Sequence, residues 1–133
     1  MSILSSFTPF NFNEGVPYAS ITINGISFNK SVMLKLNCPE YVVLLIDYAT
    51  KRIAIQCCAS TYPNAVPFYK KEKGNATWIR WNGKDLLNTL QVMMGWDLNN
   101  ASYKVDGVFL KEENAVLFDL NKATETEPAK WSK

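Results

Sequence analysis

Alternating apolar and polar positions predict strands near the start of the chain. Ile21 and Ile23 alternate with polar residues, and so do Ile26 and Phe28, but the two pairs are out of phase across an Asn-Gly pair. A strand of period two changes phase only at a turn or a bulge, and Asn-Gly is a pair that accepts positive φ. The pattern therefore predicts a strand over residues 20–28 that is interrupted in its middle.

A single short helix is predicted next. Asn29 suits its N-cap, because an asparagine side chain can accept a hydrogen bond from an amide of the first turn. Val32, Met33 and Leu36 recur at the spacing of one helical face, which predicts about two turns. Pro39 ends the helix, since proline disfavours the α conformation in the residue before it.

A hairpin of two apolar strands follows. Tyr41–Asp47 is a continuous β-branched and apolar run, short enough for a strand, and we expect it to be buried on both faces. Tyr48–Lys51 makes the turn. Arg52–Cys58 returns with Ile53 and Ile55 on one face. We expect this hairpin to be the most stable part of the protein.

The clearest helix is predicted over Lys84–Met94, where leucines and methionines fall at i, i+1, i+4, i+7 and i+8. Asn82 is expected to cap its N-terminus, and Asp85 in its first turn suits the helix dipole. Gly95 suits the left-handed position after the last turn, with Trp96 folding back on Leu90.

Two further hairpins are predicted in the second half of the chain. One is formed by Pro67-Phe68-Tyr69 and the segment from Trp78 to Trp81, on either side of a lysine-rich loop. The closing hairpin joins Tyr103–Leu110 to Ala115–Leu120.

The order strand, helix, hairpin occurs twice, over residues 19–58 and 77–120. We therefore predict an α+β, mostly β domain in which two such units pack as a pseudo-symmetric, barrel-like body. Residues 1–18 are expected to form an N-terminal arm with aromatic side chains, and residues 121–133 a flexible tail, because the tail is polar apart from Trp131.

Composition limits the class of protein. The 133 residues are 47% hydrophobic and 20% charged, which is ordinary for one globular domain. No apolar run is long enough to span a membrane, and the first residues lack the features of a signal peptide. We expect a cytoplasmic protein whose odd set of cysteines, Cys38, Cys57 and Cys58, is buried and reduced.

Catalysis is not expected. The sequence contains no histidine, which is the usual general base near neutral pH and the commonest metal ligand. No CxxC pair and no glycine-rich phosphate loop is present. The sequence therefore predicts no enzyme, no metal and no cofactor.

The residues from 21 to 56 resemble the swapped-hairpin domain of the AbrB/SpoVT type. Gly25, Ile26, Phe28 and Lys30 stand where that family has its Gly-Arg-hydrophobic-Pro turn, and Leu36 stands where its helix ends. The family comprises bacterial transition-state regulators and MazE-type antitoxins. The resemblance implies two units interlaced into a barrel that binds DNA.

The whole chain also resembles small bacterial and phage-borne proteins labelled as integrases. Recombinase chemistry is not expected from the residues, because tyrosine recombinases need an Arg–His–Arg cluster. This sequence has no histidine, and its only arginines are Arg52 and Arg80.

Charge is unevenly distributed although the net charge is only +2. Residues 28–84 contain nine Lys or Arg and three Asp or Glu, a balance of +6, whereas residues 85–133 contain five and eight, a balance of −3. A basic middle permits an anionic partner. The candidate residues for binding double-stranded DNA are Lys30, Lys51, Arg52, Lys70, Lys71, Arg80 and Lys84.

Two functions are consistent with these observations. The first is a DNA-binding or regulatory module, in the manner of the AbrB-type family. The second is a protein-interaction module, antitoxin-like or accessory to a phage, that associates with itself or with a protein partner through the aromatic arm and binds no nucleic acid.

Overall fold

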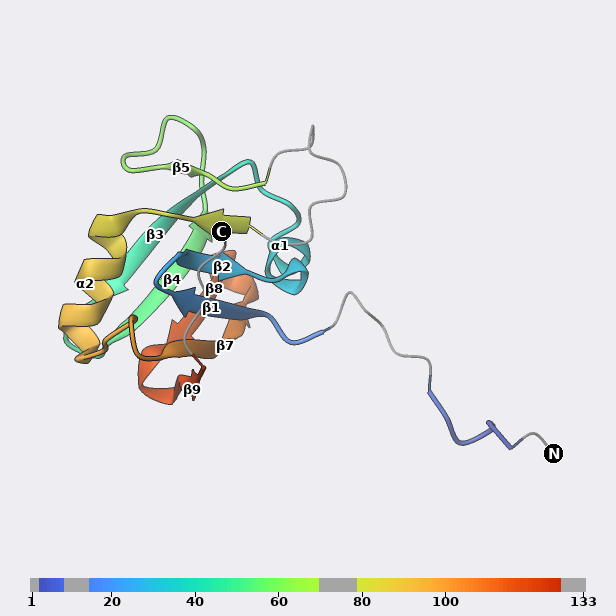
Figure 1. Cartoon of the computed structure of the whole chain (residues 1–133). Coiled ribbons are helices and arrows are strands. Elements are labelled where there is room, and N and C mark those ends of the chain that lie inside the picture. Colours follow the sequence, from blue (N-terminus) through green and yellow to red (C-terminus); the bar gives the residue numbers. More distant parts are fainter. Residues whose placement is uncertain (1–2, 9–14, 70–78, 128–133) are drawn as a thin grey trace.

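The computed structural model describes residues 3–8, 15–69 and 79–127, and these residues form a mostly β protein with one dominant sheet (Figure 1). The sheet is antiparallel and curls into a half-barrel. The predicted α+β, mostly β class is therefore confirmed.

The first two strands form a tight hairpin. β1 (Tyr18–Thr22) and β2 (Gly25–Phe28) are antiparallel, and Thr22 lies opposite Gly25. The phase change in the apolar pattern is thus a turn between two strands and not a bulge within one. Gly25 has φ +141, and a Cβ there would collide with the carbonyl oxygen of Trp81. Only glycine fits this position.

The predicted cap of the short helix α1 (Lys30–Lys35) is confirmed. The Oδ1 of Asn29 accepts hydrogen bonds from the backbone amides of Val32, at 3.3 Å, and of Tyr18, at 3.0 Å. Its Nδ2 donates to the carbonyl of Val16 at 3.0 Å. One side chain therefore starts the helix and also fastens it to the beginning of β1.

The predicted apolar hairpin is formed by β3 (Tyr41–Asp47) and β4 (Arg52–Cys57). The expectation that β3 is buried on both faces is wrong, because Leu45 is 44% exposed. Strand β5 (Val66–Pro67) pairs only with the first two residues of β3. The rest of β3 lies at the margin of the sheet, where its outer face is covered at Val43 but not at Leu45.

The hairpin predicted across the lysine-rich loop does not form in the described residues. β5 pairs with β3, whereas β6 (Ile79–Trp81) pairs with β2. The aromatic side chains of both segments instead meet in the core. The ring centroids of Phe68 and Trp81 are 6.0 Å apart, and those of Phe28 and Trp81 are 5.0 Å apart. Burial of these rings determines where the two strands lie.

The second helix, α2 (Lys84–Met94), has the predicted bounds and ends at Gly95, which has φ +70. The predicted cap by Asn82 is wrong, because Gly83 occupies the N-cap position and no side chain caps the helix. Trp96, expected to fold back on Leu90, stacks face to face on Tyr103 at 4.0 Å.

The closing hairpin is confirmed as β7 (Ser102–Leu110) and β8 (Ala115–Asp119), joined by the 3-10 turn η3 (Lys111–Glu113). β7 is long enough to belong to both halves of the sheet. Its first part pairs with β1, and residues 107–110 pair with β8. β7 therefore joins the two halves of the half-barrel.

Residues 120–126, most of them in the segment expected to be a flexible tail, are ordered. The 3-10 turn η4 (Leu120–Lys122) buries Leu120, and β9 (Thr124–Thr126) pairs with β7. Backbone pairing needs no apolar side chain, so composition does not reveal it. At the other end, the carbonyl of Pro17 accepts a hydrogen bond from Gly107 N at 2.8 Å, so the last part of the predicted arm belongs to the domain. Residues 9–14 and 128–133 lie outside the described residues.

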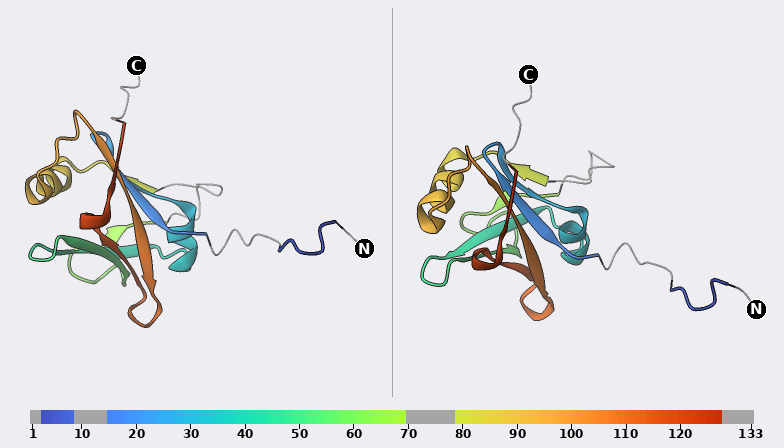
Figure 2. Two further views of the ribbon diagram at one scale, coloured as in Figure 1. Left: turned by 90° about the horizontal axis from the view of Figure 1, so that it is seen from below. Right: turned by 60° about the horizontal axis from the view of Figure 1, so that its bottom comes forward.

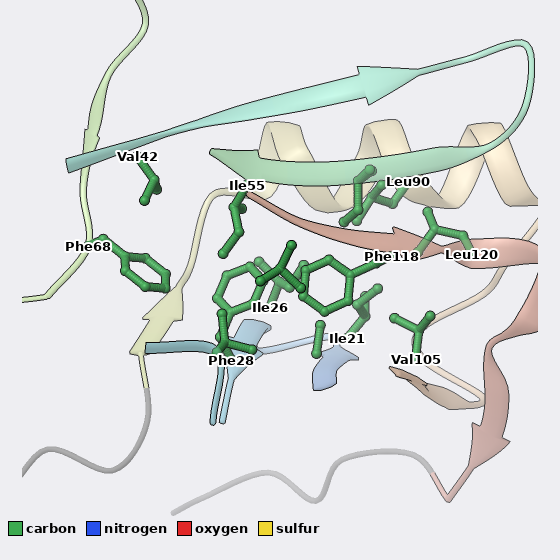
Figure 3. Packing of buried hydrophobic residues seen from close by; sticks show 14 of the residues in the cluster. Ile21, Ile26, Phe28, Val42, Ile55, Phe68, Leu90, Val105, Phe118 and Leu120 are labelled. Atoms are coloured by element: carbon green, nitrogen blue, oxygen red, sulfur yellow. The ribbon is translucent and has the colours of Figure 1, made fainter. Parts of the chain in front are cut away.

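The strand order in the sheet is β5-β3-β4-β8-β7-β1-β2-β6, with β9 beside β7. A single core fills the concave side of the sheet (Figure 3). Phe28 of β2 and Phe118 of β8 meet there with ring centroids 5.7 Å apart. The helices α1 and α2 lie at opposite ends of the half-barrel (Figures 1 and 2), and both contribute side chains to this core. Among the described residues no helix is long and apolar enough to span a membrane.

Candidate nucleic-acid interface

The structure distributes the predicted basic residues over several elements. Lys30 is the first residue of α1 and Lys84 is the first residue of α2, so they belong to helices at opposite ends of the half-barrel. Lys51 lies in the turn between β3 and β4, with φ +59. Lys70 and Lys71 lie outside the described residues.

Arg80 lies in a row of residues that crosses the outer face of the sheet. It stands opposite Ser27, Ser27 stands opposite Ser20, and Ser20 stands opposite Lys104. Residues opposite one another on neighbouring strands share a face. The alternate residues of β2 are buried in the core, so this row faces outward. We call these four residues the outer row.

The outer row has a cation at each end and short hydroxyl side chains between them. Arg80 and Lys104 are exposed, whereas Ser27 is only 7% exposed. Because neighbouring strands are about 4.8 Å apart, three strand spacings separate the two cations by about 14 Å along the sheet. The Nζ of Lys104 lies 4.1 Å from the ring centroid of Tyr18, a cation–π contact that orients the ammonium group.

A groove of about 590 Å³ adjoins the outer row where the two halves of the sheet meet. Its charged lining residues are Arg52, Lys104, Lys122, Asp106 and Asp119. Three positive and two negative charges leave it with a balance of +1. Lys104 belongs to both features, so the outer row and the groove form one continuous surface that contains Arg80 and Arg52.

The carboxylates around Arg52 reduce its availability to an anion. Its guanidinium lies 3.8 Å from the carboxylate of Asp47, in a half-exposed pair, and its Nε donates to Thr50 at 2.9 Å. The hydrogen bond from Thr50 lowers the pKa of Asp47, and the hydrogen bonds of Asn121 lower the pKa of Asp119. Both acids are therefore charged at neutral pH, and both lie close to Arg52.

The sequence analysis missed Lys104 and Lys122. The alternation in β7 indicates that Lys104 faces away from the core, beside buried Val105. The alternation does not show which residues lie beside Lys104. Lys104 and Arg80 share one face only because the hairpin β1–β2 pairs with β7 on one side and with β6 on the other. Lys122 is the last residue of η4 and lies in the segment that was expected to be a tail.

The groups available for other chemistry are few. No cluster of three His, Cys, Asp or Glu suited to a metal ion occurs among residues 3–8, 15–69 and 79–127. Cys38, Cys57 and Cys58 are free thiols, as expected, but they are half-buried and not fully buried. Partial burial, and then the neighbouring Cys58, raise the pKa of Cys57, which makes its thiol a poor nucleophile near neutral pH.

No family model matches the sequence, and no curated protein or solved structure is significantly similar to it. The function is therefore inferred from the arrangement of the side chains.

Proposed function

We propose that the protein is a non-catalytic module that binds the phosphate backbone of duplex DNA on the outer face of its sheet. The observation that carries this proposal is the outer row, in which Arg80 and Lys104 stand at either end of two serines with no carboxylate between them. Phosphate oxygens in protein–DNA complexes are contacted mostly by arginine, lysine and hydroxyl side chains. Because Ser27 is buried, the groups available for such contacts are Arg80, Lys104 and the half-buried Ser20.

The two cations have different surroundings from Arg52. The guanidinium of Arg52 has two carboxylates as neighbours, whereas the outer row itself contains none, and Lys104 has only Asp106 on the same face of β7. A phosphate that approaches Arg52 must compete with those carboxylates. We therefore assign the main contacts to Arg80 and Lys104 and a smaller contribution to Arg52 and Lys122 in the groove.

We also propose that the chain contains two related units. Such a repeat would agree with the resemblance to the AbrB-type domain, in which two units are interlaced. With β5 taken as the counterpart of β1, the units are β1-β2-α1-β3-β4 and β5-β6-α2-β7-β8. The hairpin β3–β4 then corresponds to β7–β8, and the pair β1–β7 corresponds to β5–β3. The pairs β2–β6 and β4–β8 correspond to themselves, as a two-fold relation requires. A β5–β6 ladder is the one counterpart missing from the described residues, and there the half-barrel is open.

Fluorescence anisotropy of a labelled, mixed-sequence duplex tests the DNA proposal. We expect binding that weakens steeply between about 50 and about 200 mM salt, because phosphate contacts release counterions. The double change Arg80→Gln and Lys104→Gln should lower the slope of log affinity against log salt by about 2, since each phosphate contact contributes about 0.9.

Matched single variants locate the interface. Lys104→Gln, near the start of β7, and Lys111→Gln, in η3 directly after its end, remove the same charge at positions about 23 Å apart for seven residues of strand. Only the first should weaken binding, and Arg52→Gln should weaken it less than Lys104→Gln does. If Lys111→Gln lowers the DNA affinity as much as Lys104→Gln does, the effect reflects the overall charge of the protein and not the outer row. If the wild-type chain does not bind DNA at the lower salt, the DNA proposal is wrong.

A protein-interaction function is the second candidate, because the described N-terminal segment exposes large apolar side chains. Ile3 is 89% exposed, Leu4 60% and Phe7 70%. Deletion of residues 1–14 leaves the hydrogen bonds of Val16 and Pro17 to the domain in place. If the arm mediates self-association, sedimentation should show fewer subunits per particle for this truncation than for the full chain. An unchanged number of subunits contradicts that role.

A further inference from the structure

The edge of β3 is open over most of its length. β5 occupies it only at Tyr41 and Val42. Residues 43–47 have β4 on one side and no strand on the other within the described part of the chain. The β3–β4 hairpin lies at the margin of the body in both views of Figure 2. Backbone N–H and C=O groups at such an edge are available to another strand.

This edge lacks the features that usually prevent pairing. Exposed sheet edges are typically protected by proline, lysine, a bulge or a very short strand. Val43, Leu44, Leu45 and Ile46 are all apolar, and their register with β4 is regular. The opposite edge, β6, is only three residues long and exposes Arg80 at its centre. Between these two edges in the described part of the chain, that of β3 is therefore the better suited to adding a strand.

We propose that the edge of β3 pairs antiparallel with β3 of a second copy of the chain, across a two-fold axis at Leu45. This pairing places Leu44 opposite Ile46 and Val43 opposite Asp47, so that no like charges face each other. A two-fold axis at a strand residue keeps side chains on their own faces. Leu44 and Ile46, which are half-buried, remain on the core side, and Leu45 remains outside.

The neighbouring registers use the edge less well. An axis at Leu44 needs Val42, whose edge is already paired with β5. An axis at Ile46 pairs only residues 45–47 with the second copy, because the strand ends at Asp47. The axis at Leu45 uses all the free residues of β3, from Val43 to Asp47, and no others.

The same axis joins two exposed apolar rows into one. Leu45 stands opposite Ala54, Ala54 opposite Leu117, and Leu117 opposite Val108. Leu45 is 44% exposed and Val108 is 59% exposed. In the dimer this row continues through the pair of Leu45 residues into the partner. Two-fold, isologous pairing is also the commonest form of self-association.

The contact is small, so the dimer should be weak. Interfaces below about 1,200 Å² in total are typical of transient association, and we expect a dissociation constant in the micromolar range. Sedimentation equilibrium from about 1 to about 200 µM brackets that range. The wild-type chain should pass from the monomer mass toward the dimer mass.

Leu45→Lys should weaken the dimer about tenfold or more, because it places two ammonium groups opposite each other across the axis. Val108→Lys is the matched control. It adds the same charge to the same exposed row, but on β7, away from the edge. It should leave the dissociation constant within about a factor of two. A circular dichroism melt identifies either variant that has lost its fold.

Mixing separates the edge from other modes of association. Leu45→Glu alone should weaken the dimer to a similar extent, whereas an equimolar mixture of Leu45→Lys and Leu45→Glu should associate more tightly than either variant alone, because opposite charges then face each other. The truncation that lacks residues 1–14 should still dimerise. A single monomer mass for the wild-type chain, equal weakening by Val108→Lys, or failure of the mixture to associate would each overturn the proposal. None of these results depends on DNA binding.

Discussion

Gly107 stands where β7 changes partners, from β1 to β8. A Cβ at this position would lie 2.6 Å from the Cγ1 of Val116 and 2.8 Å from the Cε1 of Phe118. Both neighbours are fully buried core residues. Without a side chain at residue 107, β7 can approach the core closely enough to join the two halves of the sheet.

Gly107→Ala should therefore destabilise the protein by roughly 1–3 kcal/mol, the usual cost of overpacking a well-filled core. Gly83→Ala is the packing control, since a Cβ there meets only the Cβ of Leu86 at an ordinary 3.8 Å, and its cost should be limited to the poorer N-cap preference of alanine, about 0.5 kcal/mol. Urea unfolding monitored by circular dichroism measures both. Equal stability of the two variants would show that the side chains of Val116 and Phe118 can move to accommodate the added methyl group at little cost in free energy.

The two helices begin in different ways although both are preceded by a potential capping asparagine. Asn29 makes hydrogen bonds to three backbone groups, those of Val32, Tyr18 and Val16. Asn82 does not cap α2, because Gly83 occupies the N-cap position. From residue type alone, Asn29 and Asn82 are equally suitable N-caps. The position at which each helix begins determines that only Asn29 caps its helix.

Asn29→Ala should cost about 1–2 kcal/mol, because it removes a helix cap and leaves the amide of Tyr18 without this acceptor. Asn82→Ala should change the free energy of unfolding by less than about 0.5 kcal/mol, as a surface substitution does. Thermal melts of the two variants provide the comparison. A cost at Asn82 as large as that at Asn29 would contradict the observed cap geometry.

Elements with a strong local pattern were predicted closely. The bounds of β3 and of α2 agree with the apolar run and with the apolar stripe. β9 was missed because its Thr-Glu-Thr sequence is polar and it is held by backbone pairing with β7. The burial of β3 was misjudged because a strand's run of apolar residues does not reveal whether another element covers it.

At the scale of the whole molecule, each half of the chain depends on the other. β4 pairs with β8, β1 pairs with β7, and β2 pairs with β6. Phe28 and Phe118 come from different halves and meet in one core. A half-sheet alone would expose the apolar face that it buries in the full chain.

The fragments 1–69 and 79–133 should therefore each be largely unfolded when purified separately, and should regain β structure when mixed. Circular dichroism and resistance to proteolysis of the fragments, alone and together, test this. An ordered fragment on its own would mean that the unit proposed as a repeat is stable without its counterpart. We do not expect mixing to reduce the order of either fragment.

The sequence by itself determined the local elements of this protein: the Asn-Gly turn, the two helices, the two apolar hairpins and the absence of histidine chemistry. Local patterns report local geometry, because the periods of helices and strands repeat within a few residues. The tertiary structure decided which strands lie side by side. It placed Arg80 with Lys104 on one face, surrounded Arg52 with carboxylates and left the edge of β3 open. These features depend on contacts between residues far apart in the chain, which leave no periodic trace in the sequence.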